Sequence, residues 1–281
     1  MKTEVLNKSE NVESGTFLME FEGAELLSRF ELPVAKSALA TTKEQAVEIA
    51  KRIGYPVVLK GMSRQIVHKT EAGIVKLNIK DEQELIENFD NILENASKYN
   101  RDAVMAGVLI QQMAPKGIEL IFGIKKDPTF GHQLVIGYGG TLVEIFKDFS
   151  MRMMPVSVTD VEEMIQELKT SKLLEGYRGQ NGINMNLLYS ICLSLNDLVE
   201  AHPEIEELDL NPVIFADQNA FICDVRILIG ERTLTESSLK DLSNIKYMIN
   251  PRSIAVVGAS KNEKKNGGRL FRYIVENGFS G

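Results

Sequence analysis

The chain has no apolar run long enough to cross a membrane. A spanning helix needs ~20 consecutive apolar residues, and the opening MKTEVLNKSENVESG is polar, without the apolar core of a signal peptide. These two absences predict a protein of the cytoplasm. With 281 residues, 44% of them apolar, the chain still carries enough hydrophobic material for a folded core.

Cysteine is also scarce, and the 32 basic residues are outnumbered by 39 acidic ones. Cys192 and Cys223 have no partner at metal-ligand spacing and are too few for a disulfide framework, so both are predicted to be reduced thiols in the core. The formal net charge is −7 and the lysines are scattered among acids, which excludes the clustered basic face that nucleic-acid binding requires. The sequence has no internal repeat and no low-complexity tract.

What the first hundred residues do contain is an alternation of helical and strand patterns. One helix is expected over 17–27. A second begins with the capping-box pair Thr42 and Gln45 and ends at Gly54. Two strands and a long amphipathic helix follow, at 56–60, at 73–79 and from Asp81.

From Val108 onward the pattern changes to strands separated by turn signals. The segments VLIQQM, IELIFGIKK, HQLVIGYG and TLVEIF alternate with turns such as KDPTFG and GYGG, which predicts an antiparallel sheet in a second lobe. Helices over 161–168 and 187–199 are expected to cover this sheet, and two closing strands, ELDLNPVIF and AFICDVRILI, meet at the turn ADQN. The predicted fold class is α/β, of α+β type, with two lobes.

Lys60 ends one predicted strand beside a polar loop, GMSRQIVHKTEAG. A cation at the mouth of a sheet, next to backbone amides, suits phosphate because partial burial strengthens its attraction. A lysine that extends from a strand end into solvent is the structural alternative. His68, in the same loop, has an imidazole able to take a phosphoryl group as a nucleophile, or is an ordinary surface histidine. The residues alone leave both pairs of alternatives open.

Asp209, Asn211 and Asp224 lie on the two closing strands, on either side of the turn ADQN. Residues one strand length apart come opposite each other in a hairpin, so Asn211 and Asp224 are expected to offer oxygen atoms to one hard cation. Magnesium prefers few protein ligands plus substrate phosphates, which this pair satisfies. The alternative is that Asn211 shapes the turn before Pro212 and that Asp224 is a solvated strand residue.

The connection between the two predicted lobes reads QQMAPKGIE, from Gln111 to Glu119. The Glu119 carboxylate and the exposed backbone of such a connection suit the hydroxyl groups and the ring edge of a nucleotide. The segment gains weight because it lies between the phosphate candidate Lys60 and the metal candidates.

Six segments taken together resemble one known family. They are YPVVLK, IVHKTEAGIVKLN, QQMAPKGIELIFGIKKDPTFG, GYGGTLVEIFKDFSMRMMPV, LLEGYRG and ELDLNPV. In order and spacing they resemble the ATP-grasp part of the ADP-forming (NDP-forming) acyl-CoA synthetases, or acetate-CoA ligases, which are related to the succinyl-CoA synthetase β subunit. The resemblance covers about 17–229 and favours the functional interpretations of Lys60, His68, Asn211 and Asp224.

The resemblance implies a two-lobed ATP-grasp fold and the reversible reaction acyl-CoA + ADP + phosphate ⇌ acid + CoA + ATP, through an acyl phosphate and a phosphohistidine. The implied ligands are ATP or ADP and Mg²⁺. For the nucleotide, the resemblance implies that Lys60 binds the phosphates and that the loop through Gly73 closes on them. It also implies that Glu119 binds the ribose and that the adenine pocket is lined by Gln111, Gln112, Met113 and Ala114. Asn211 and Asp224 are implied to bind magnesium, Asp209 to help receive a phosphorylated histidine loop, and His68 to relay the phosphoryl group.

The last residues, NPRSIAVVGASKNEKKNGGRLFRYIVENGFSG, predict a strand over 253–257 and a helix, joined by a turn at Gly258. By resemblance they begin the family's CoA-binding domain, a Rossmann-type fold. Coenzyme A is therefore expected only through a missing domain, and the chain is interpreted as a truncated product, a fragment or part of a split protein. The expected domains are a polar leader over 1–16, an ATP-grasp domain over 17–231 with lobes of about 17–105 and 106–231, a linker over 232–250 and the incomplete domain over 251–281.

Three hypotheses for function follow. The first is an enzyme, an acid-thiol ligase that works with a partner chain or domain supplying the CoA-binding and ligase parts. The second is a catalytically silent module that binds ATP and magnesium. The third is another ATP-grasp ligase, of carboxylase type, which shares the fold and Lys60 but does not need the HKT loop or the Rossmann-type start. Nucleic acid and membrane are not expected partners.

Overall fold

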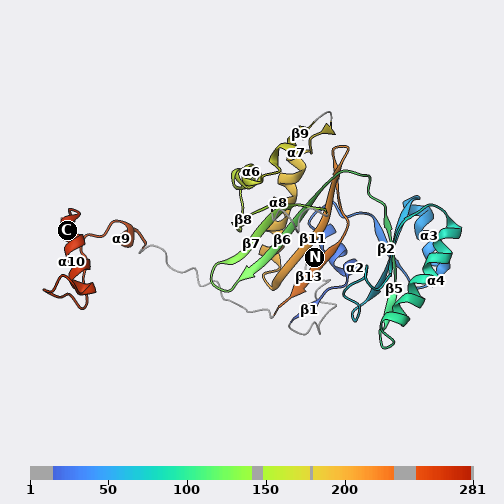
Figure 1. Cartoon of the computed structure of the whole chain (residues 1–281), viewed down its shortest axis with the longest axis horizontal. Helices are drawn as coiled ribbons and strands as arrows, with labels where there is room; N and C mark the ends of the chain where they lie inside the picture. Colours follow the sequence, from blue (N-terminus) through green and yellow to red (C-terminus); the bar gives the residue numbers. More distant parts are fainter. Residues whose placement is uncertain (1–14, 141–147, 178–179, 231–244, 280–281) are drawn as a thin grey trace. The chain divides into compact units, whose positions relative to one another are not determined.

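The computed structural model describes residues 15–140, 148–177, 180–230 and 245–279 (Figure 1). The chain divides into two units, Met1–Arg232 and Thr233–Gly281, and each is described by itself. Among its described residues, the first unit contains two large antiparallel sheets, which form the centres of two lobes, and one small two-stranded sheet. Within the described ranges, no helix combines the length and the apolar character that a bilayer crossing demands.

The small lobe is a four-stranded sheet in the order β2-β5-β3-β4, with two helices against it (Figure 1). Thr42 caps the first helix, since its side chain accepts a hydrogen bond from the Gln45 N–H at 3.3 Å, as predicted. The Gln45 side chain returns to the N–H of Thr41, one residue earlier than a capping box requires. The elements are β2 (Ser37–Ala40), α3 (Lys43–Ile53), β3 (Val57–Ser63), β4 (Val75–Ile79), α4 (Glu82–Tyr99) and β5 (Met105–Gln112).

The predicted apolar face of α4 packs on this sheet. Leu85, Phe89 and Ile92 are at most 3% exposed and share one core with residues of α3 and of strands β3 and β5. Burying each of these side chains contributes about 1.5–3 kcal/mol. The helices therefore cover one face of the sheet and leave its other face free to form a wall of a site.

The large lobe is a sheet in the order β1-β13-β11-β6-β7-β8, in which β12 also pairs with β11. Helices α2, α6, α7 and α8 belong to this lobe, with α2 against β13 and α6 against β8. The elements are β1 (Thr16–Phe17), α2 (Glu20–Ser28), β6 (Ile118–Asp127), β7 (Gly131–Tyr138), β8 (Phe149–Met153), α6 (Val158–Glu167), α7 (Ser171–Glu175), β9 (Gly176–Tyr177), β10 (Gln180–Asn181), α8 (Met185–Ala201), β11 (Ile205–Ala216), β12 (Asn219–Ile222) and β13 (Val225–Ile229).

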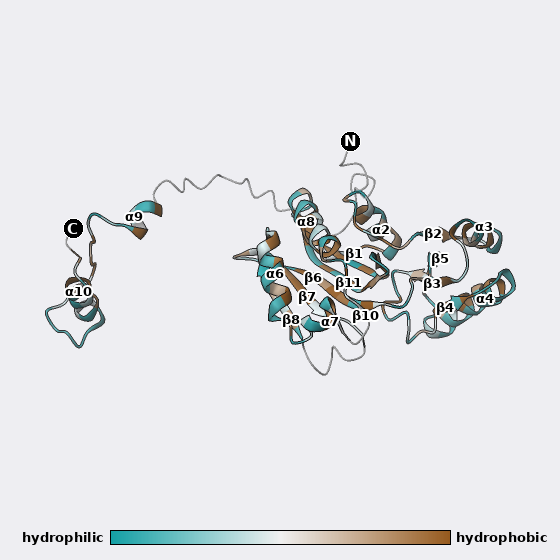
Figure 2. Cartoon of the chain, turned by 90° about the horizontal axis from the view of Figure 1, so that it is seen from above, coloured by the Kyte–Doolittle hydropathy of each residue, from teal (hydrophilic) through white to brown (hydrophobic). Residues whose placement is uncertain are grey.

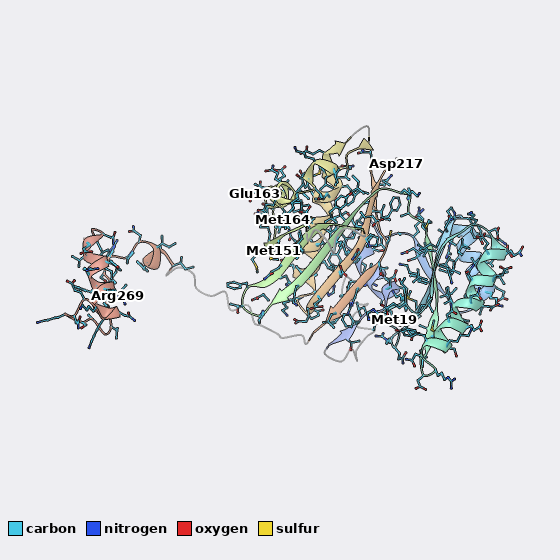
Figure 3. All side chains as sticks on the ribbon, viewed as in Figure 1. Met19, Met151, Glu163, Met164, Asp217 and Arg269 are labelled. Carbon is cyan, nitrogen blue, oxygen red and sulfur yellow. The ribbon has the colours of Figure 1, made fainter. Side chains whose placement is uncertain are left out.

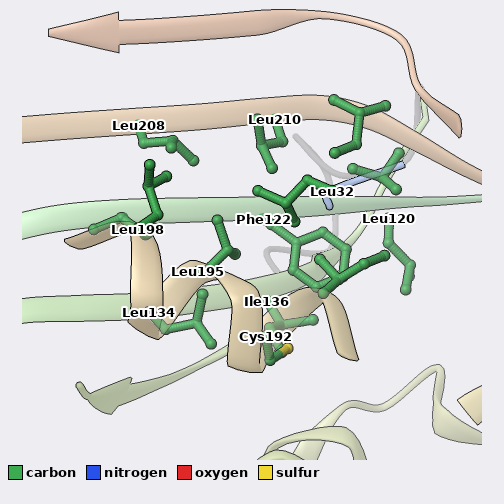
Figure 4. Packing of buried hydrophobic residues seen from close by; sticks show 14 of the residues in the cluster. Leu32, Leu120, Phe122, Leu134, Ile136, Cys192, Leu195, Leu198, Leu208 and Leu210 are labelled. Carbon is green, nitrogen blue, oxygen red and sulfur yellow. The ribbon is translucent and has the colours of Figure 1, made fainter. Parts of the chain in front are cut away.

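The core of the large lobe lies between this sheet and α8. Phe122 of β6 is fully buried among leucine and isoleucine side chains from the neighbouring strands and from the helix (Figure 4). Strands β6, β7 and β11 contribute hydrophobic residues to this core, and these give the brown stretches of the sheet in Figure 2. Cys192 belongs to the same core, as predicted, and burial raises the pKa of its thiol to about 12.

The predicted boundary between the lobes at 105/106 is wrong. The segment VLIQQM was placed in the second sheet, but β5 pairs with β2 and β3 and so belongs to the small lobe. At the other end, Leu26 and Leu27 of α2 pack into the core of the large lobe, although the helix precedes the small lobe in sequence. An alternating pattern of apolar residues predicts that a segment is a strand, but it does not predict which strand is its neighbour. The sequence therefore did not show that β5 belongs to the small lobe and α2 to the large lobe.

The second closing strand is divided. The segment AFICDVRILI was predicted as one strand, and it forms β12 and β13 with a break at Cys223 and Asp224. Both parts pair with β11, which stays continuous across the break. The predicted strand TLVEIF lies outside the described residues.

The unit Thr233–Gly281 contains α9 (Ile245–Ile249) and α10 (Asn266–Glu276) among its described residues. The helix predicted near the end of the chain is present as α10. The strand predicted over 253–257 is not formed, because a strand needs a hydrogen-bonded neighbour and the described part of this unit provides none. Helix α9 falls inside the segment that was predicted to be a plain linker.

Candidate functional site

A pocket of about 950 Å³ opens between the two sheets of the first unit. Its small-lobe wall is formed by Val58, Lys60 and Met62 of β3 with Val75 and Leu77 of β4. The facing wall belongs to the large lobe and includes Glu119, Asp209, Asn211, Ile214 and Asp224. An apolar surface that carries one lysine thus faces a surface of polar groups.

Lys60 lies within β3, and not at its end as predicted, because the strand continues to Ser63. The residue is 7% exposed. Its Nζ donates to Oε1 of Glu20 at 2.5 Å and to the carbonyl oxygen of Cys223 at 2.6 Å, and it lies 4.0 Å from Oδ1 of Asp224. These contacts exclude the alternative of a lysine that extends into solvent.

Lys69 brings a second ammonium group to the same place. Its Nζ donates to Oε2 of Glu20 at 2.5 Å and lies 3.6 Å from Oδ1 of Asp224. Burial lowers the pKa of Lys69, but the attraction of Glu20 and Asp224 outweighs it and the net shift is upward. Burial likewise opposes ionisation of Asp224, and Lys60 and Lys69 reverse this effect, so the pKa of Asp224 is below its ordinary value. Lys69 and Asp224 are therefore both charged at neutral pH.

Glu20 is a site residue that the sequence analysis missed. Its side chain is 1% exposed, and its two carboxylate oxygens each accept a hydrogen bond from one lysine. Burial raises the pKa of Glu20 and the nearby Asp224 raises it further, while Lys60 and Lys69 oppose the rise, and the net shift is upward. A signal was present in the sequence: Glu20 precedes Ala24 and Leu27 by four and seven residues, so a charged residue stands on the apolar face of its helix. A charge in that position requires a buried partner.

Asn211 and Asp224 lie opposite each other, as the hairpin argument predicted. The register pairs Leu210 with Val225 and then Val213 with Ile222, which leaves the two residues after Leu210 facing Cys223 and Asp224. Because the strand is broken at this point, the Asp224 side chain is free to turn into the pocket, where 47% of it is exposed. Burial raises the pKa of the Cys223 thiol to about 11, and this cysteine lines the pocket instead of lying in the core as predicted.

Asp209 lies two residues before Asn211 on β11 and is paired with Arg226 of β13. Loss of water in the pocket raises the pKa of Asp209, the nearby Asp224 raises it further, and Arg226 opposes both. Within the described ranges, no three histidine, cysteine, aspartate or glutamate side chains come together as a metal-binding group.

His68 is exposed on the loop between β3 and β4 and lines the pocket. Its backbone carbonyl accepts a hydrogen bond from the Ala72 N–H at 3.0 Å, within the loop. Gly73 does not line the pocket. It closes the loop with a positive φ of 68°, and its carbonyl accepts a hydrogen bond from the Asn95 side chain at 3.0 Å. Gly73 therefore shapes the loop and fixes it to α4.

The connection between the lobes lines the end of the pocket away from this loop. Gln111, Gln112, Met113, Ala114 and Glu119 all contribute to the lining. Gln111 is 3% exposed within β5, and Glu119 stands on β6 opposite Ile214. The N–H of Gln112 donates to Lys36 and that of Met113 donates to Pro56, which holds the connection against the small lobe.

A family model described as an ATP-grasp domain matches residues 11–229. The chain belongs to the ATP-grasp family. This ATP-grasp chain is 41% identical over 212 residues to acetate-CoA ligase (ADP-forming) I subunit beta of Pyrococcus furiosus, an alignment that covers 75% of the chain and 91% of the relative. It is 40% identical over 264 residues to acetate-CoA ligase (ADP-forming) II of Archaeoglobus fulgidus, covering 94% of the chain and 37% of that relative.

Among solved structures, the ATP-grasp chain is similar to the dinucleotide forming acetyl-coenzyme A synthetase 1 of Ca. Korarchaeum cryptofilum in complex with coenzyme A, Ca-AMPCP and HgCl+. The TM-score is 0.77 at 37% identity, covering 82% of this chain and 100% of the other. The predicted family and the two-lobed fold are thus confirmed. The chain spans little more than a third of the Archaeoglobus protein and most of the Pyrococcus subunit, so it is homologous to the ATP-grasp domain or subunit of ADP-forming acetyl-CoA synthetases.

Proposed function

We propose that this chain is the nucleotide-binding part of an ADP-forming acyl-CoA synthetase, with the reaction acyl-CoA + ADP + phosphate ⇌ acid + CoA + ATP. The observation that carries the proposal is the convergence of Lys60, Lys69 and Asp224 in a pocket between two lobes. Two ammonium groups beside a carboxylate are what a polyphosphate with its divalent cation requires. The family relationship supports the same assignment.

Lys60 and Lys69 would hold the phosphate groups. An ammonium group has three N–H donors, of which Lys60 uses two on Glu20 and Cys223, and Lys69 uses one on Glu20. Each lysine therefore has at least one N–H left to donate to a phosphate oxygen while its hydrogen bonds to Glu20 and, for Lys60, to Cys223 remain in place. At 4 Å and an effective dielectric near 20, each such charge pair is worth about 4 kcal/mol before desolvation.

Asn211 and Asp224 fit a magnesium ion. Both supply oxygen atoms, they come from facing positions on β11 and at the β12–β13 break, and Mg²⁺ commonly takes one or two protein ligands with water and phosphate oxygens as the rest. When bound, the ion would offset the negative charge of the phosphates. Asp224 would supply a negatively charged ligand for the ion. Lys60 and Lys69 lower the pKa of Asp224, which keeps its carboxyl group ionised.

The remaining part of the pocket suits a nucleoside. Val58, Val75 and Leu77 offer an apolar surface to a base, and the backbone of Gln111 to Ala114 borders its edge. Glu119 would accept hydrogen bonds from the ribose hydroxyl groups. The Korarchaeum relative, which was solved with Ca-AMPCP, supports nucleotide binding by this fold.

His68 is proposed to relay the phosphoryl group. A ring nitrogen would form a bond to the γ-phosphorus of ATP while the bond from that phosphorus to the bridging oxygen of ADP breaks, and the group would pass on towards the acid. Asp209, which lines the pocket, would help to receive a phosphorylated histidine loop from the CoA-binding and ligase parts.

The relay role predicts a loss of label. With [γ-³²P]ATP and Mg²⁺, His68→Ala is expected to lose at least about nine-tenths of the acid-labile label that the wild type takes up, because the nucleophile is removed. His132→Ala is the matched control, since the ring of His132 hydrogen-bonds Ile205 away from the pocket lining. Equal labelling of His68→Ala and wild type would exclude the relay.

Coenzyme A and the acid are proposed to bind to a chain or domain that supplies the CoA-binding and ligase parts. The Pyrococcus relative is named as a subunit beta, and the Archaeoglobus relative continues well beyond the matched length. That alignment is longer than the first unit, so it extends into Thr233–Gly281, which we propose is the beginning of the CoA-binding domain.

Asp224→Asn is expected to weaken MgATP binding about tenfold, because an amide is a poorer magnesium ligand than a carboxylate and pairs less well with the lysines. Isothermal titration calorimetry with Mg²⁺ and with EDTA measures this, and the variant should also lose most of the Mg²⁺ dependence. Asp217→Asn is the control: Asp217 lies in the turn at the end of β11, at a φ of 47° that asparagine tolerates (Figure 3). Failure of the wild type to bind any adenine nucleotide with Mg²⁺ would refute the proposed function.

A further inference from the structure

One carboxylate connects the two lysines of the pocket. Oε1 of Glu20 accepts a hydrogen bond from Lys60 and Oε2 accepts one from Lys69, each at 2.5 Å. The two cations repel each other, and a negative charge shared between them removes the cost of holding them side by side in a partly buried pocket. Among the residues described, Asp224 also lies near both lysines, 4.0 Å from Lys60 and 3.6 Å from Lys69, but Glu20 makes the shorter contact with each.

The three partners come from different lobes. Glu20 begins α2, which packs against β13 of the large lobe, whereas Lys60 is on β3 and Lys69 is on the following loop of the small lobe. Arg64, from the same small-lobe loop, adds contacts from its guanidinium to the Phe17 carbonyl at 3.1 Å and to Glu22 at 3.0 Å. The start of α2 therefore fixes the small lobe's cations relative to the large lobe's wall.

Exposure of the side chains shows the direction from which an anion arrives. It falls from 47% at Asp224 to 22% at Lys69, 9% at Lys60 and 1% at Glu20. Glu20 thus lies behind the ammonium groups, on their side away from the solvent. A phosphate that enters the pocket meets the lysines before it meets Glu20 and has no need to displace that carboxylate.

We propose that Glu20 is a positioning residue: its carboxylate holds Lys60 and Lys69 together as one phosphate-binding pair across the two lobes. This inference rests on the proposed function, because it concerns the same polyphosphate. Without the Glu20 carboxylate, only the longer contacts to Asp224 link the two cations, and each presents its donors less precisely. Glu20 itself touches no phosphate in this arrangement.

The test compares Glu20→Gln with Glu22→Gln. Glu22 is on the same helix and pairs with Arg64 of the same loop, but it does not contact the two lysines, so it is a matched control. Calorimetry with MgATP and with inorganic tripolyphosphate is expected to show about tenfold weaker binding for Glu20→Gln and little change for Glu22→Gln. Glu20→Asp, which keeps the charge with a shorter reach, is expected to recover part of the loss.

A second measurement does not depend on nucleotide. In the ¹⁵N-lysine-labelled protein, ammonium groups that are buried and hydrogen-bonded exchange slowly and give observable signals. The signals of Lys60 and Lys69 are expected to vanish in Glu20→Gln and to persist in Glu22→Gln. A residue that only stabilises the fold would lower the melting temperature and leave both the binding constant and these signals unchanged.

The outcomes are distinct. If no variant and no wild type binds MgATP, the proposed function fails, and the lysine signals alone decide whether Glu20 holds the pair. Tighter binding by Glu20→Gln would mean that the carboxylate competes with phosphate, and would overturn the proposal. If Glu20→Gln does not fold, Glu20→Asp takes its place, and unchanged binding together with unchanged lysine signals in that variant would also overturn it.

Discussion

Replacing Lys60 with methionine is expected to weaken MgATP binding about 100-fold or more, which corresponds to at least ~2.8 kcal/mol. Methionine keeps much of the length and the apolar stem of lysine, so the change removes chiefly the positive charge. Because Lys60 is 7% exposed in the pocket, its attraction to phosphate is screened far less than that of a surface lysine. Isothermal titration calorimetry measures the effect directly.

Lys76→Met is the matched control for this variant. Lys76 is on β4, the strand next to β3, and does not line the pocket. It is expected to bind MgATP as the wild type does. The fold of Lys60→Met is checked by circular dichroism, since Glu20 keeps Lys69 as a partner in this variant. Equal affinities of the Lys60 and Lys76 variants would show that Lys60 has no part in phosphate binding.

Phe122→Ala is expected to lower the free energy of unfolding by about 3–5 kcal/mol. The Phe122 side chain is fully buried between the large sheet and α8, in contact with a core that cannot collapse completely into the space left by the ring (Figure 4). The expected result is a lower urea midpoint with an unchanged slope, measured by circular dichroism.

Phe130→Ala provides the comparison for the core variant. Phe130 stands in the turn between β6 and β7, where it is 71% exposed. Its removal is expected to change the free energy of unfolding by less than about 0.5 kcal/mol. A similar loss in both variants would contradict the view that the stability of this lobe comes from the enclosed core.

Local structure was predictable from the sequence where neighbouring residues determine it. Thr42 caps α3 and Asp81 caps α4 because the side chain and the N–H that it satisfies are three residues apart. The hairpin register that brings Asn211 opposite Asp224 was likewise predictable, since it follows from the length of the strands around one turn. These features need no knowledge of the rest of the chain.

Other features depend on contacts between distant segments. The bond from Lys60 to Glu20 joins residues 40 positions apart, and the bond from Lys60 to Cys223 joins residues 163 positions apart. The pairing of β5 with the small-lobe strands, and the packing of α2 on the large lobe, are of the same kind. Periodicity in one segment does not specify its partner, so the contacts of Glu20 with Lys60 and Lys69 could not be predicted from the sequence.

The strand that opens the first unit and the strand that closes it are hydrogen-bonded neighbours, with Thr16 paired to Ile229 and the N–H of Gly15 bonded to the same residue. Both points of attachment therefore lie at one corner of the fold. A unit built in this way can be joined to further protein at either end, or produced as a separate polypeptide, without rearranging its interior. Gene fusion or gene fission at these ends would leave the internal contacts of the unit intact. This agrees with relatives that are a short subunit in one organism and a much longer chain in another.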